Sequence, residues 1–388
     1  MIPRRAHKTI LDLAQGFPFV AITGPRQSGK TTLSRAAFPD KPYASLEDPD
    51  LREFADNDPR GFLAGYPDGA IFDEVQRCPQ LFSYLQTRAD LDGRQGLYIL
   101  TGSQQFGLFS NITQSLAGRV GMVQLLPFSS TELNQAGIPP ISLDELLFTG
   151  LYPPIYDRPV SPAQWYSGYI HTYLERDVRQ MINVRDLSAF QRFLRLCAAR
   201  TGQLLNLSSL ANDCSITHNT AKAWISILEA SYIVHLLLPH HSNFNKRLIK
   251  SPKLYFHDTG LAAWLVGIHE KSHLSFHPLR GALFETWVVG ELLKGRFNRG
   301  LPSNLYFWRD STGNEVDVLF DQGLTLEPLE IKAGQTVTSD YFTGLKKWIG
   351  LAGQSAGRPF LVYGGDKLQT RQEVDVIPWS KISSITER

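Results

Sequence analysis

Cysteine is scarce in this 388-residue chain, and long apolar runs are absent. Its three cysteines, Cys78, Cys197 and Cys214, lie far apart and form no close pairs. This excludes a cysteine-rich zinc motif and a disulfide framework, and it favours a reducing compartment. No window approaches 18 uninterrupted apolar residues, and the amino-terminal segment lacks the apolar core of a signal peptide. We therefore expect a cytoplasmic protein with no membrane partner.

The net charge is also small. Lys and Arg total 39 against 37 for Asp and Glu, which gives +2. A surface for a polyanion such as DNA must then be a local patch, because the whole chain supplies no attractive field. The hydrophobic share of 43% and the length predict a globular protein of two or three domains.

A glycine-rich loop, GPRQSGKTT, stands between a strand-like run (FPFVAIT) and a helix-like run (LSRAAF). It matches the pattern G-x-x-x-x-G-K-[ST] of a phosphate-binding loop. In such a loop backbone amides surround the phosphates, the lysine reaches the β- and γ-phosphates, and the hydroxyl takes a Mg²⁺ position. The candidate ATP-binding residues are those of the loop and two positions downstream: Gly24, Pro25, Arg26, Gln27, Ser28, Gly29, Lys30, Thr31, Thr32, Ser103 and Arg119.

The run DGAIFDEVQ supplies two acids to this site. Its apolar part predicts a buried parallel strand with Asp73 and Glu74 at the carboxyl end. Asp73 is expected to hold Mg²⁺ together with Thr31, and Glu74 to polarise the attacking water. Lys30 and Glu74 are thus the candidate catalytic residues for ATP hydrolysis.

Two further polar positions have open interpretations. In GLYILTGS, Ser103 either senses the γ-phosphate or caps a helix. In SLAGRVG, Arg119 either reaches a γ-phosphate, in its own chain or in a neighbouring subunit of a homo-oligomer, or is a solvated turn residue.

The middle of the chain predicts helices followed by a winged helix. Residues 129–200 read as a helical lid or linker region with several prolines, and residues 201–253 as two short helices and two strands. Asn219, Thr220, Lys222 and Trp224 would lie near the start of a recognition helix. The cations expected on or near the wing, where they would meet DNA phosphates, are Lys246, Arg247, Lys250 and Lys253. The alternative is a protein-protein module.

The last third has the element order α-β-β-β-α-β, which is that of a restriction-endonuclease-like core. EVDVLF and LEIKAG place Asp317 on one strand and Glu330 with Lys332 on the next, and Glu285 lies on the preceding helix. The period of two puts Glu330 and Lys332 on one strand face. Here carboxylates such as Asp317 and Glu330 would hold Mg²⁺, and the lysine would stabilise the developing charge of a cleaved phosphodiester. The alternatives are a metal site retained for DNA binding and a salt-bridged hairpin.

Several segments occur in the order seen in a known family: GPRQSGKTTL, SLEDPDLREFADNDPRGFL, AIFDEVQRCPQLF, YILTGSQQF, SLAGRVGMVQLLPFSSTEL, YIHTYLERDVRQ and ALFETWVVGELLK. The chain resembles, over essentially its whole length, a prokaryotic family of AAA-type ATPases. In that family a carboxyl-terminal domain of unknown function, related to PD-(D/E)xK nucleases, follows the ATPase domain. The resemblance implies ATP as the nucleotide, and no guanine-specific N-K-x-D run is apparent. One departure is FTGLYP at residues 148–153, where paired glycines are expected.

We therefore predict an α/β protein with an AAA-type P-loop parallel-sheet core at 1–128, a helical region at 129–200, a winged-helix-like segment at 201–253 and a restriction-endonuclease-like domain at 254–388. It would couple ATP and Mg²⁺ binding and hydrolysis to a DNA-acting module, with or without Mg²⁺-dependent nuclease activity. The alternative is a nucleotide-dependent switch that binds DNA or a protein, with an inert nuclease-like domain.

Overall fold

The computed structural model describes residues 2–103, 116–173, 186–240 and 249–387. The chain divides into two compact units. Unit 1 comprises Met1–Phe128 with two short later segments, Glu229–Tyr232 and Arg296–Pro302. Unit 2 comprises Ser129–Leu228, Ile233–Gly295 and Ser303–Arg388. Within the described ranges, no helix combines the length and the apolar character needed to cross a membrane.

Unit 1 contains a five-stranded sheet of order β2-β3-β4-β1-β5, in which each neighbouring pair is parallel. β1, β3 and β4 are buried along their whole length, as parallel strands covered on both faces should be. Parallel strands end at one common edge, so the loop after β1 and the end of β3 meet there. The strands are β1 (Phe19–Thr23), β2 (Tyr43–Ser45), β3 (Ala70–Asp73), β4 (Tyr98–Gly102) and β5 (Val120–Gln124).

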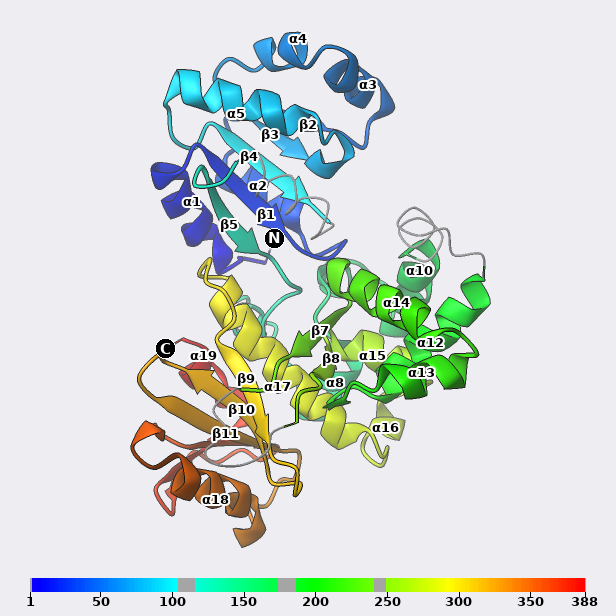
Figure 1. Ribbon diagram of the computed structural model, residues 1–388, viewed down its shortest axis with the longest axis vertical. Coiled ribbons are helices and arrows are strands. Elements are labelled where there is room, and N and C mark those ends of the chain that lie inside the picture. The colour runs from blue at the N-terminus through cyan, green and yellow to red at the C-terminus, as the bar shows by residue number, and fades with distance from the viewer. Residues whose placement is uncertain (1, 104–115, 174–185, 241–248, 388) are drawn as a thin grey trace. The chain divides into compact units, whose positions relative to one another are not determined.

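Helices cover both faces of this sheet (Figure 1). Side chains of α1 and α2 share a core with Val20 and Ile22, whereas α3, α4 and α5 share one with Phe19 and Ala21. Successive residues of β1 thus serve opposite cores, which is the pleat of a strand buried on both sides. The helices are α1 (Ala6–Gly16), α2 (Lys30–Ala37), α3 (Pro49–Asn57), α4 (Pro59–Ala64) and α5 (Leu81–Asp92).

The first part of unit 2 is mainly helical. Ser129 and Glu132 form a capping box at the start of α7. In the FTGLYP turn, Gly150 has φ 68° and ends α8, and a Cβ there would lie 2.1 Å from the Tyr166 hydroxyl. One glycine is therefore enough for this turn. The helices are α7 (Ser130–Gln135), α8 (Leu143–Thr149), α9 (Pro153–Asp157), α10 (Pro162–Tyr173), α12 (Leu187–Ala199), α15 (Thr259–Leu265) and α16 (Lys271–Leu274).

A small antiparallel sheet of order β6-β8-β7 follows within unit 2. Two helices precede β7, and Ser215, with φ 57°, makes the tight turn between them. This is the element order predicted for a winged helix, although that classification stays a prediction, because the wing tip at 241–248 lies outside the described residues. The elements are β6 (Gln203–Leu204), α13 (Leu207–Cys214), α14 (His218–Ala230), β7 (Val234–Leu237) and β8 (Lys253–Phe256).

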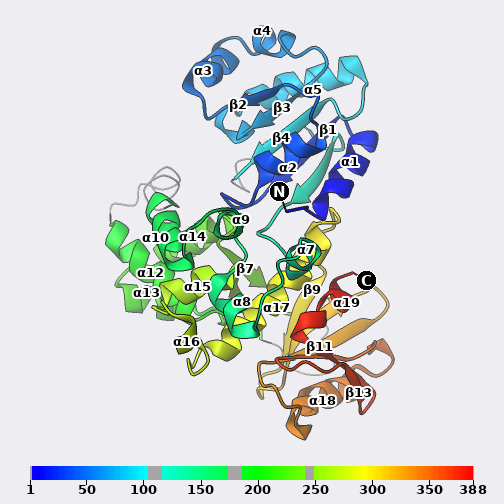
Figure 2. The ribbon, with the colours of Figure 1, turned by 180° about the vertical axis from the view of Figure 1, so that it is seen from behind.

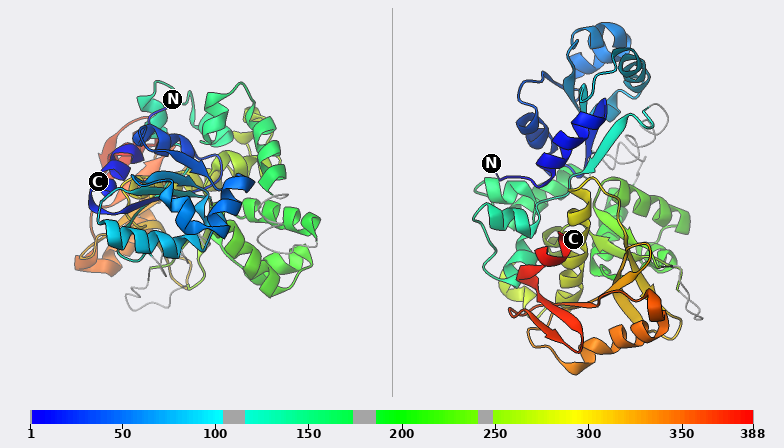
Figure 3. Two further views of the ribbon diagram at one scale, coloured as in Figure 1. Left: turned by 90° about the horizontal axis from the view of Figure 1, so that it is seen from above. Right: turned by 90° about the vertical axis from the view of Figure 1, so that its left-hand side faces the viewer.

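The carboxyl-terminal part of unit 2 has a six-stranded sheet of order β13-β14-β12-β11-β10-β9. The pairs β9–β10 and β10–β11 are antiparallel, and β11–β12 and β12–β14 are parallel. α18 lies on one face of this sheet, as Figures 2 and 3 show. Its Leu345 and Trp348 share a core with side chains of the strands. The elements are α17 (Arg280–Phe297), β9 (Leu305–Arg309), β10 (Glu315–Asp321), β11 (Leu326–Lys332), α18 (Thr343–Ala352), β12 (Phe360–Tyr363), β13 (Gln369–Arg371), β14 (Val374–Pro378) and α19 (Ser383–Thr386).

The predicted order α-β-β-β-α-β is present as α17-β9-β10-β11-α18-β12. The sequence reasoning missed β13, β14 and α19, which follow it. Kinship with nucleases is not shown by this order and stays a prediction.

Candidate functional site

The glycine-rich loop connects β1 to α2 in unit 1. Gly24 has φ 151°, and a Cβ on it would lie 2.1 Å from the Leu125 carbonyl oxygen, so only glycine fits there. Gly29 (φ 90°) and Gln27 (φ 64°) also have left-handed backbones. The Ser28 hydroxyl is buried with no hydrogen-bond partner among the described atoms, and Thr32 lies exposed on α2. The loop amides gather at the amino end of α2, where an anion is favoured.

The predicted loop residues and acids come together at the carboxyl edge of the sheet. The buried Lys30 ammonium donates to the carbonyl oxygens of Gly24 and Pro25, at 3.0 and 2.8 Å. The Thr31 hydroxyl lies 3.1 Å from both carboxylate oxygens of Asp73. A hydroxyl and a carboxylate at this spacing are the hard oxygen donors that Mg²⁺ prefers, and the unpartnered Ser28 hydroxyl is a further polar atom of the loop. These residues fit ATP with Mg²⁺.

Glu74 is held beside Asp73. Its Oε2 accepts hydrogen bonds from the Ser103 hydroxyl at 2.8 Å and from the Gln76 side chain. Burial alone would raise the pKa of Glu74. The charge of Lys30 and the hydrogen bonds from Ser103 and Gln76 outweigh burial and hold the pKa below its usual value. Glu74 is therefore an ionised, oriented carboxylate, as an acceptor for the attacking water must be.

Two residues of the site escaped the sequence reasoning. The Tyr43 hydroxyl on β2 donates to Asp73 Oδ2 at 2.7 Å. Burial, followed by this hydrogen bond to Asp73, raises the pKa of Tyr43 to about 12. The Arg4 guanidinium donates to the Ser28 and Leu126 carbonyl oxygens, both at 2.6 Å, and so braces the back of the loop. No local motif marks either residue, although the basic start IPRR is a weak signal for Arg4.

Two arginines share one carboxylate at this edge. Arg26 of the glycine-rich loop and Arg77, three residues after Glu74, each lie 3.5 Å from Glu47 Oε1. All three side chains are partly exposed. The pairs are long, so they hold the arginines weakly.

The structure corrects the prediction that Arg119 reaches a γ-phosphate in its own chain. Its carbonyl oxygen accepts from the Phe19 amide, which places Arg119 at the amino end of β1, away from the loop that follows Thr23. Its guanidinium pairs with both carboxylate oxygens of Asp90 on α5, at 2.6 and 3.1 Å. Because β1 and β5 run parallel with Phe19 beside Val120, the residue before Val120 lies at the end of the sheet opposite the glycine-rich loop. A role for Arg119 toward a neighbouring subunit stays a prediction.

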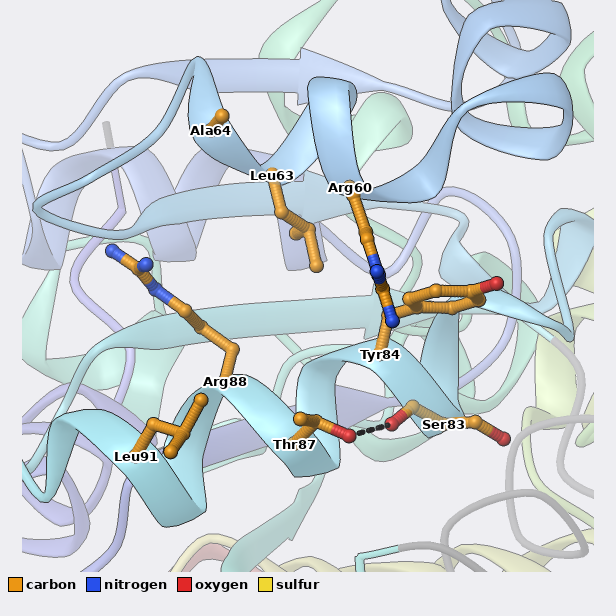
Figure 4. A pocket seen from close by; sticks show the side chains of 8 residues that line it. All are labelled: Arg60, Leu63, Ala64, Ser83, Tyr84, Thr87, Arg88 and Leu91. Atoms are coloured by element: carbon orange, nitrogen blue, oxygen red, sulfur yellow. Dashed lines mark hydrogen bonds between the residues drawn. The ribbon is translucent and has the colours of Figure 1, made fainter.

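A groove of about 420 Å³ lies between α4 and α5 of unit 1 (Figure 4). None of its residues belongs to the glycine-rich loop or is one of the two acids, so it is separate from the nucleotide site. The lining residues are Arg60, Leu63, Ala64, Ser83, Tyr84, Thr87, Arg88 and Leu91.

The predicted DNA-contacting residues of unit 2 separate into two groups. Asn219 and Lys222 are exposed near the start of α14, and Lys250 is exposed too. Trp224 lies on α14 as predicted, but it is only 6% exposed and packs on Phe190 and Phe193, so it does not belong to a DNA-contacting surface. An indole on the inner face of α14 belongs to the core. Lys246 and Arg247 lie outside the described residues.

The four predicted nuclease-like residues lie close together in unit 2, where Glu315 joins them. We call Glu285, Glu315, Asp317 and Glu330 the carboxylate cluster. Lys332 contacts Glu330 and lies 3.8 Å from Asp317 Oδ2, and the Ile331 amide donates to the same oxygen at 2.8 Å. Glu330 Oε2 is buried with no hydrogen-bond partner among the described atoms.

A second lysine, Lys253, lies within the carboxylate cluster. The prediction that Lys253 meets DNA phosphates on or near the wing is wrong, because it begins β8 and is only 3% exposed. Its Nζ lies 2.9 Å from Glu285 Oε1 and 3.8 Å from Asp317 Oδ1, and it also contacts Glu315. Local sequence gave no sign of this, because the pairing of β8 with its neighbours decides it.

The carboxylate cluster does not have the form of a metal centre. Among the described residues, no group of three or more His, Cys, Asp or Glu side chains is arranged to hold a metal ion. Burial, then the charge of Asp317, raises the pKa of both Glu285 and Glu330. Burial lowers the pKa of Lys332, but Asp317 and Glu330 outweigh it and raise that pKa to about 12. The residues present thus fit internal ion pairs better than Mg²⁺.

Comparison with known families divides the chain into three parts. Residues 16–134 match the model of an AAA domain. Residues 141–272 and 280–382 match two models described as domains of unknown function, DUF8612 and DUF4143, and neither description gives an activity. Unit 1 therefore carries an AAA-type P-loop ATPase domain, which supports nucleotide binding and hydrolysis.

Two curated mycobacterial proteins are similar over most of the chain. They are the uncharacterized proteins Rv2008c of Mycobacterium tuberculosis and Mb2031c of Mycobacterium bovis. Each is 32% identical over 324 residues, which is 82% of this chain and 71% of the relative. Among solved structures, the Walker-type ATPase PABY2304 of Pyrococcus abyssi is 14% identical, with a TM-score of 0.47, over 68% of this chain and 96% of that one.

Proposed function

Because this chain belongs to the same family as the mycobacterial proteins Rv2008c and Mb2031c and carries an AAA domain, we propose that it is an ATP-driven switch. ATP with Mg²⁺ binds at the glycine-rich loop of unit 1, and Glu74 activates the water for hydrolysis. The nucleotide state then changes how unit 2 binds a partner. The observation that carries the hydrolytic part is the alignment of Thr31, Asp73 and Glu74 at one sheet edge.

A tyrosine of the later chain supports coupling between nucleotide state and unit 2. Tyr232, in the short stretch between α14 and β7, belongs to unit 1, and its hydroxyl donates to the Thr23 hydroxyl at 2.7 Å. Thr23 is the last residue before the glycine-rich loop. A shift of that loop on phosphate binding would therefore pull on the covalent link that leads into β7. The other later segment of unit 1, Arg296–Pro302, also contacts the amino-terminal part of that unit, because the Thr9 hydroxyl donates to the Asn298 carbonyl oxygen at 2.8 Å.

The partner that the residues of unit 2 favour is DNA. His218, Asn219 and Lys222 form an exposed polar start of α14, after the tight turn at Ser215. A helix presented in this way can enter a major groove, and Lys222 can contact a phosphate. Because the net charge is only +2, we expect weak, salt-sensitive binding.

The test measures DNA binding in different nucleotide states. The affinity of the full chain for duplex DNA, followed by fluorescence anisotropy, should differ by about threefold or more between ADP and a non-hydrolysable ATP analogue. Lys222→Ala should weaken binding in both states, whereas Lys381→Ala, which removes an exposed lysine far along the chain, should not.

Tyr232→Phe then separates coupling from chemistry. It should keep the ATPase rate and reduce the difference in DNA affinity between the two nucleotide states. If the unmodified chain hydrolyses ATP but binds DNA equally well with ADP and with the ATP analogue, the switch is rejected. The chain would then be an ATPase whose nucleotide state does not control DNA binding.

A further inference from the structure

Lys253 lies beside two of the residues predicted for the nuclease-like site, Glu285 and Asp317. Its ammonium contacts Glu285 and Glu315 and lies 3.8 Å from Asp317. These carboxylates come from α17 and β10, so the lysine of β8 bridges three elements of unit 2. The Tyr255 hydroxyl, two residues along β8, donates to the same oxygen of Glu285 at 2.5 Å.

The backbone of Lys253 is held between two strands, and its side chain is buried. Lys253 pairs with Leu204 of β6 on one side and with Leu237 of β7 on the other, so β8 is the central strand of its sheet. Its side chain is 3% exposed. A side chain anchored in this way has little freedom to leave, and its removal would expose buried carboxylates to each other without a counter-charge.

Three cations already lie beside the four carboxylates of the carboxylate cluster. Lys253 faces Glu285, Glu315 and Asp317, as described above. Lys332 serves Glu330 and Asp317, and Arg309 lies 3.0 Å from Glu315 Oε2. A divalent ion would have to enter against three nearby cations and lose its own water, with few free carboxylate oxygens to replace it. Glu330 Oε2 is the exception, and one oxygen does not hold Mg²⁺.

We propose that the Lys253 ammonium is a covalently tethered cation that replaces the metal of the carboxylate cluster. The cluster therefore takes up no Mg²⁺ and cleaves no phosphodiester bond. It instead locks the small sheet that follows α14 onto α17 and β10. Unit 2 is thus a binding module, and this inference goes beyond the ATP-driven switch because it holds whether or not ATP is hydrolysed.

The first test is a Mn²⁺ titration of the nucleotide-free full chain with Asp73→Asn, which removes a metal ligand of the nucleotide site. Electron paramagnetic resonance reports free Mn²⁺ directly. We expect no bound ion up to about 1 mM, a concentration at which Mg²⁺ and Mn²⁺ sites of nucleases would fill. One bound ion per chain that is lost on Asp317→Asn would overturn the proposal.

The second test removes the tethered cation. Lys253→Ala should lower the melting temperature in EDTA, and millimolar Mn²⁺ should then raise it by about 5 °C, because the emptied cluster gains a metal site. Lys294→Ala is the matched control. Lys294 is also 3% exposed and pairs with Glu291 at 2.9 Å, away from the carboxylate cluster, so its loss should be destabilising without rescue by Mn²⁺.

Equal responses of Lys253→Ala and Lys294→Ala to Mn²⁺ would contradict the proposal. If Lys253→Ala does not fold in EDTA but folds in Mn²⁺, that result also supports the proposal. If it folds in neither solution, the Mn²⁺ titration described above decides. Plasmid DNA incubated with Mg²⁺ or Mn²⁺ should stay intact, and cutting that Lys332→Ala abolishes would also refute it. ATP hydrolysis by the unmodified chain used in the plasmid assay is measured in parallel. A failure of this inference can then be told apart from a failure of the proposed ATP-driven switch.

Discussion

Tyr43 gives a sharp prediction because it touches the nucleotide site only through Asp73. Its hydroxyl donates to Asp73 Oδ2 at 2.7 Å, and Thr31 and Thr101 contact the same carboxylate. Tyr43→Phe removes one of three hydroxyl groups that orient this acid. Tyr43 is therefore a positioning residue, whose loss should weaken Mg²⁺ binding without removing any group that meets the nucleotide.

The magnitude follows from the exposure of the residue. A hydrogen bond to a charged group contributes about 1.5–3 kcal/mol when it is buried. Tyr43 is 37% exposed, so water can partly replace its hydroxyl, and we expect about 1 kcal/mol, or roughly a fivefold effect. Partners behind a metal ligand typically change metal affinity by about 10–100-fold, and we expect a smaller effect here because Tyr43 is partly exposed.

The assay is steady-state ATP hydrolysis as a function of Mg²⁺ concentration. In Tyr43→Phe the concentration for half-maximal rate should rise about fivefold, while the rate at saturating Mg²⁺ changes little. Tyr66→Phe is the control, because Tyr66 packs on Phe62 and Phe72 in the same unit but does not contact Asp73. An unchanged Mg²⁺ dependence in Tyr43→Phe, or an equal shift in Tyr66→Phe, would refute the reasoning.

Three other changes test separate features. Gly24→Ala should abolish ATP binding in a titration, because its Cβ would meet the Leu125 carbonyl oxygen at 2.1 Å; wild-type affinity would contradict the loop geometry. Glu47→Gln should tighten ATP binding about twofold to threefold at unchanged melting temperature, since it removes a carboxylate charge that Arg26 and Arg77 share at long distance; weaker binding would reject this role. Burial lowers the pKa of His235 to about 4, so the folded form binds fewer protons than the unfolded form between pH 6.5 and 4. That contribution to stability is present above pH 6.5 and lost toward pH 4, so His235→Gln should flatten the fall of unfolding free energy in denaturant titrations over this range, and an unchanged slope would count against it.

Local sequence patterns predicted much of the architecture. The glycine-rich loop between an apolar strand and a helix, and the acids closing the run AIFDE, specify their own geometry, because each lies within one turn or strand. The alternation in EVDVLF and LEIKAG likewise predicted β10 and β11, with Glu330 and Lys332 on one face. The AAA-domain match to residues 16–134 supports the first of these interpretations.

The errors concern contacts between distant segments. One interpretation of Arg119 placed it at the phosphates of its own chain, but the register of β5 beside β1 puts it at the other end of the sheet. Lys253 was expected to meet DNA phosphates on or near the wing, whereas the central position of β8 buries it against acids that occur much later in the chain. Trp224 was grouped with the DNA-contacting residues of a recognition helix, and helix packing buries it. The hydrophobic pattern within one segment does not predict which other segment of the chain will pack against it.

The most direct test of the account is a comparison of ATP binding and single-turnover hydrolysis in the unmodified chain and in Glu74→Gln. Glutamine keeps the size of the side chain and removes the charge that accepts the proton of water. We predict ATP affinity within about threefold of the unmodified chain and hydrolysis slower by about 100-fold or more. Hydrolysis at the unmodified rate would contradict the assignment of Glu74 as the residue that activates water, and with it the ATP-driven switch as described.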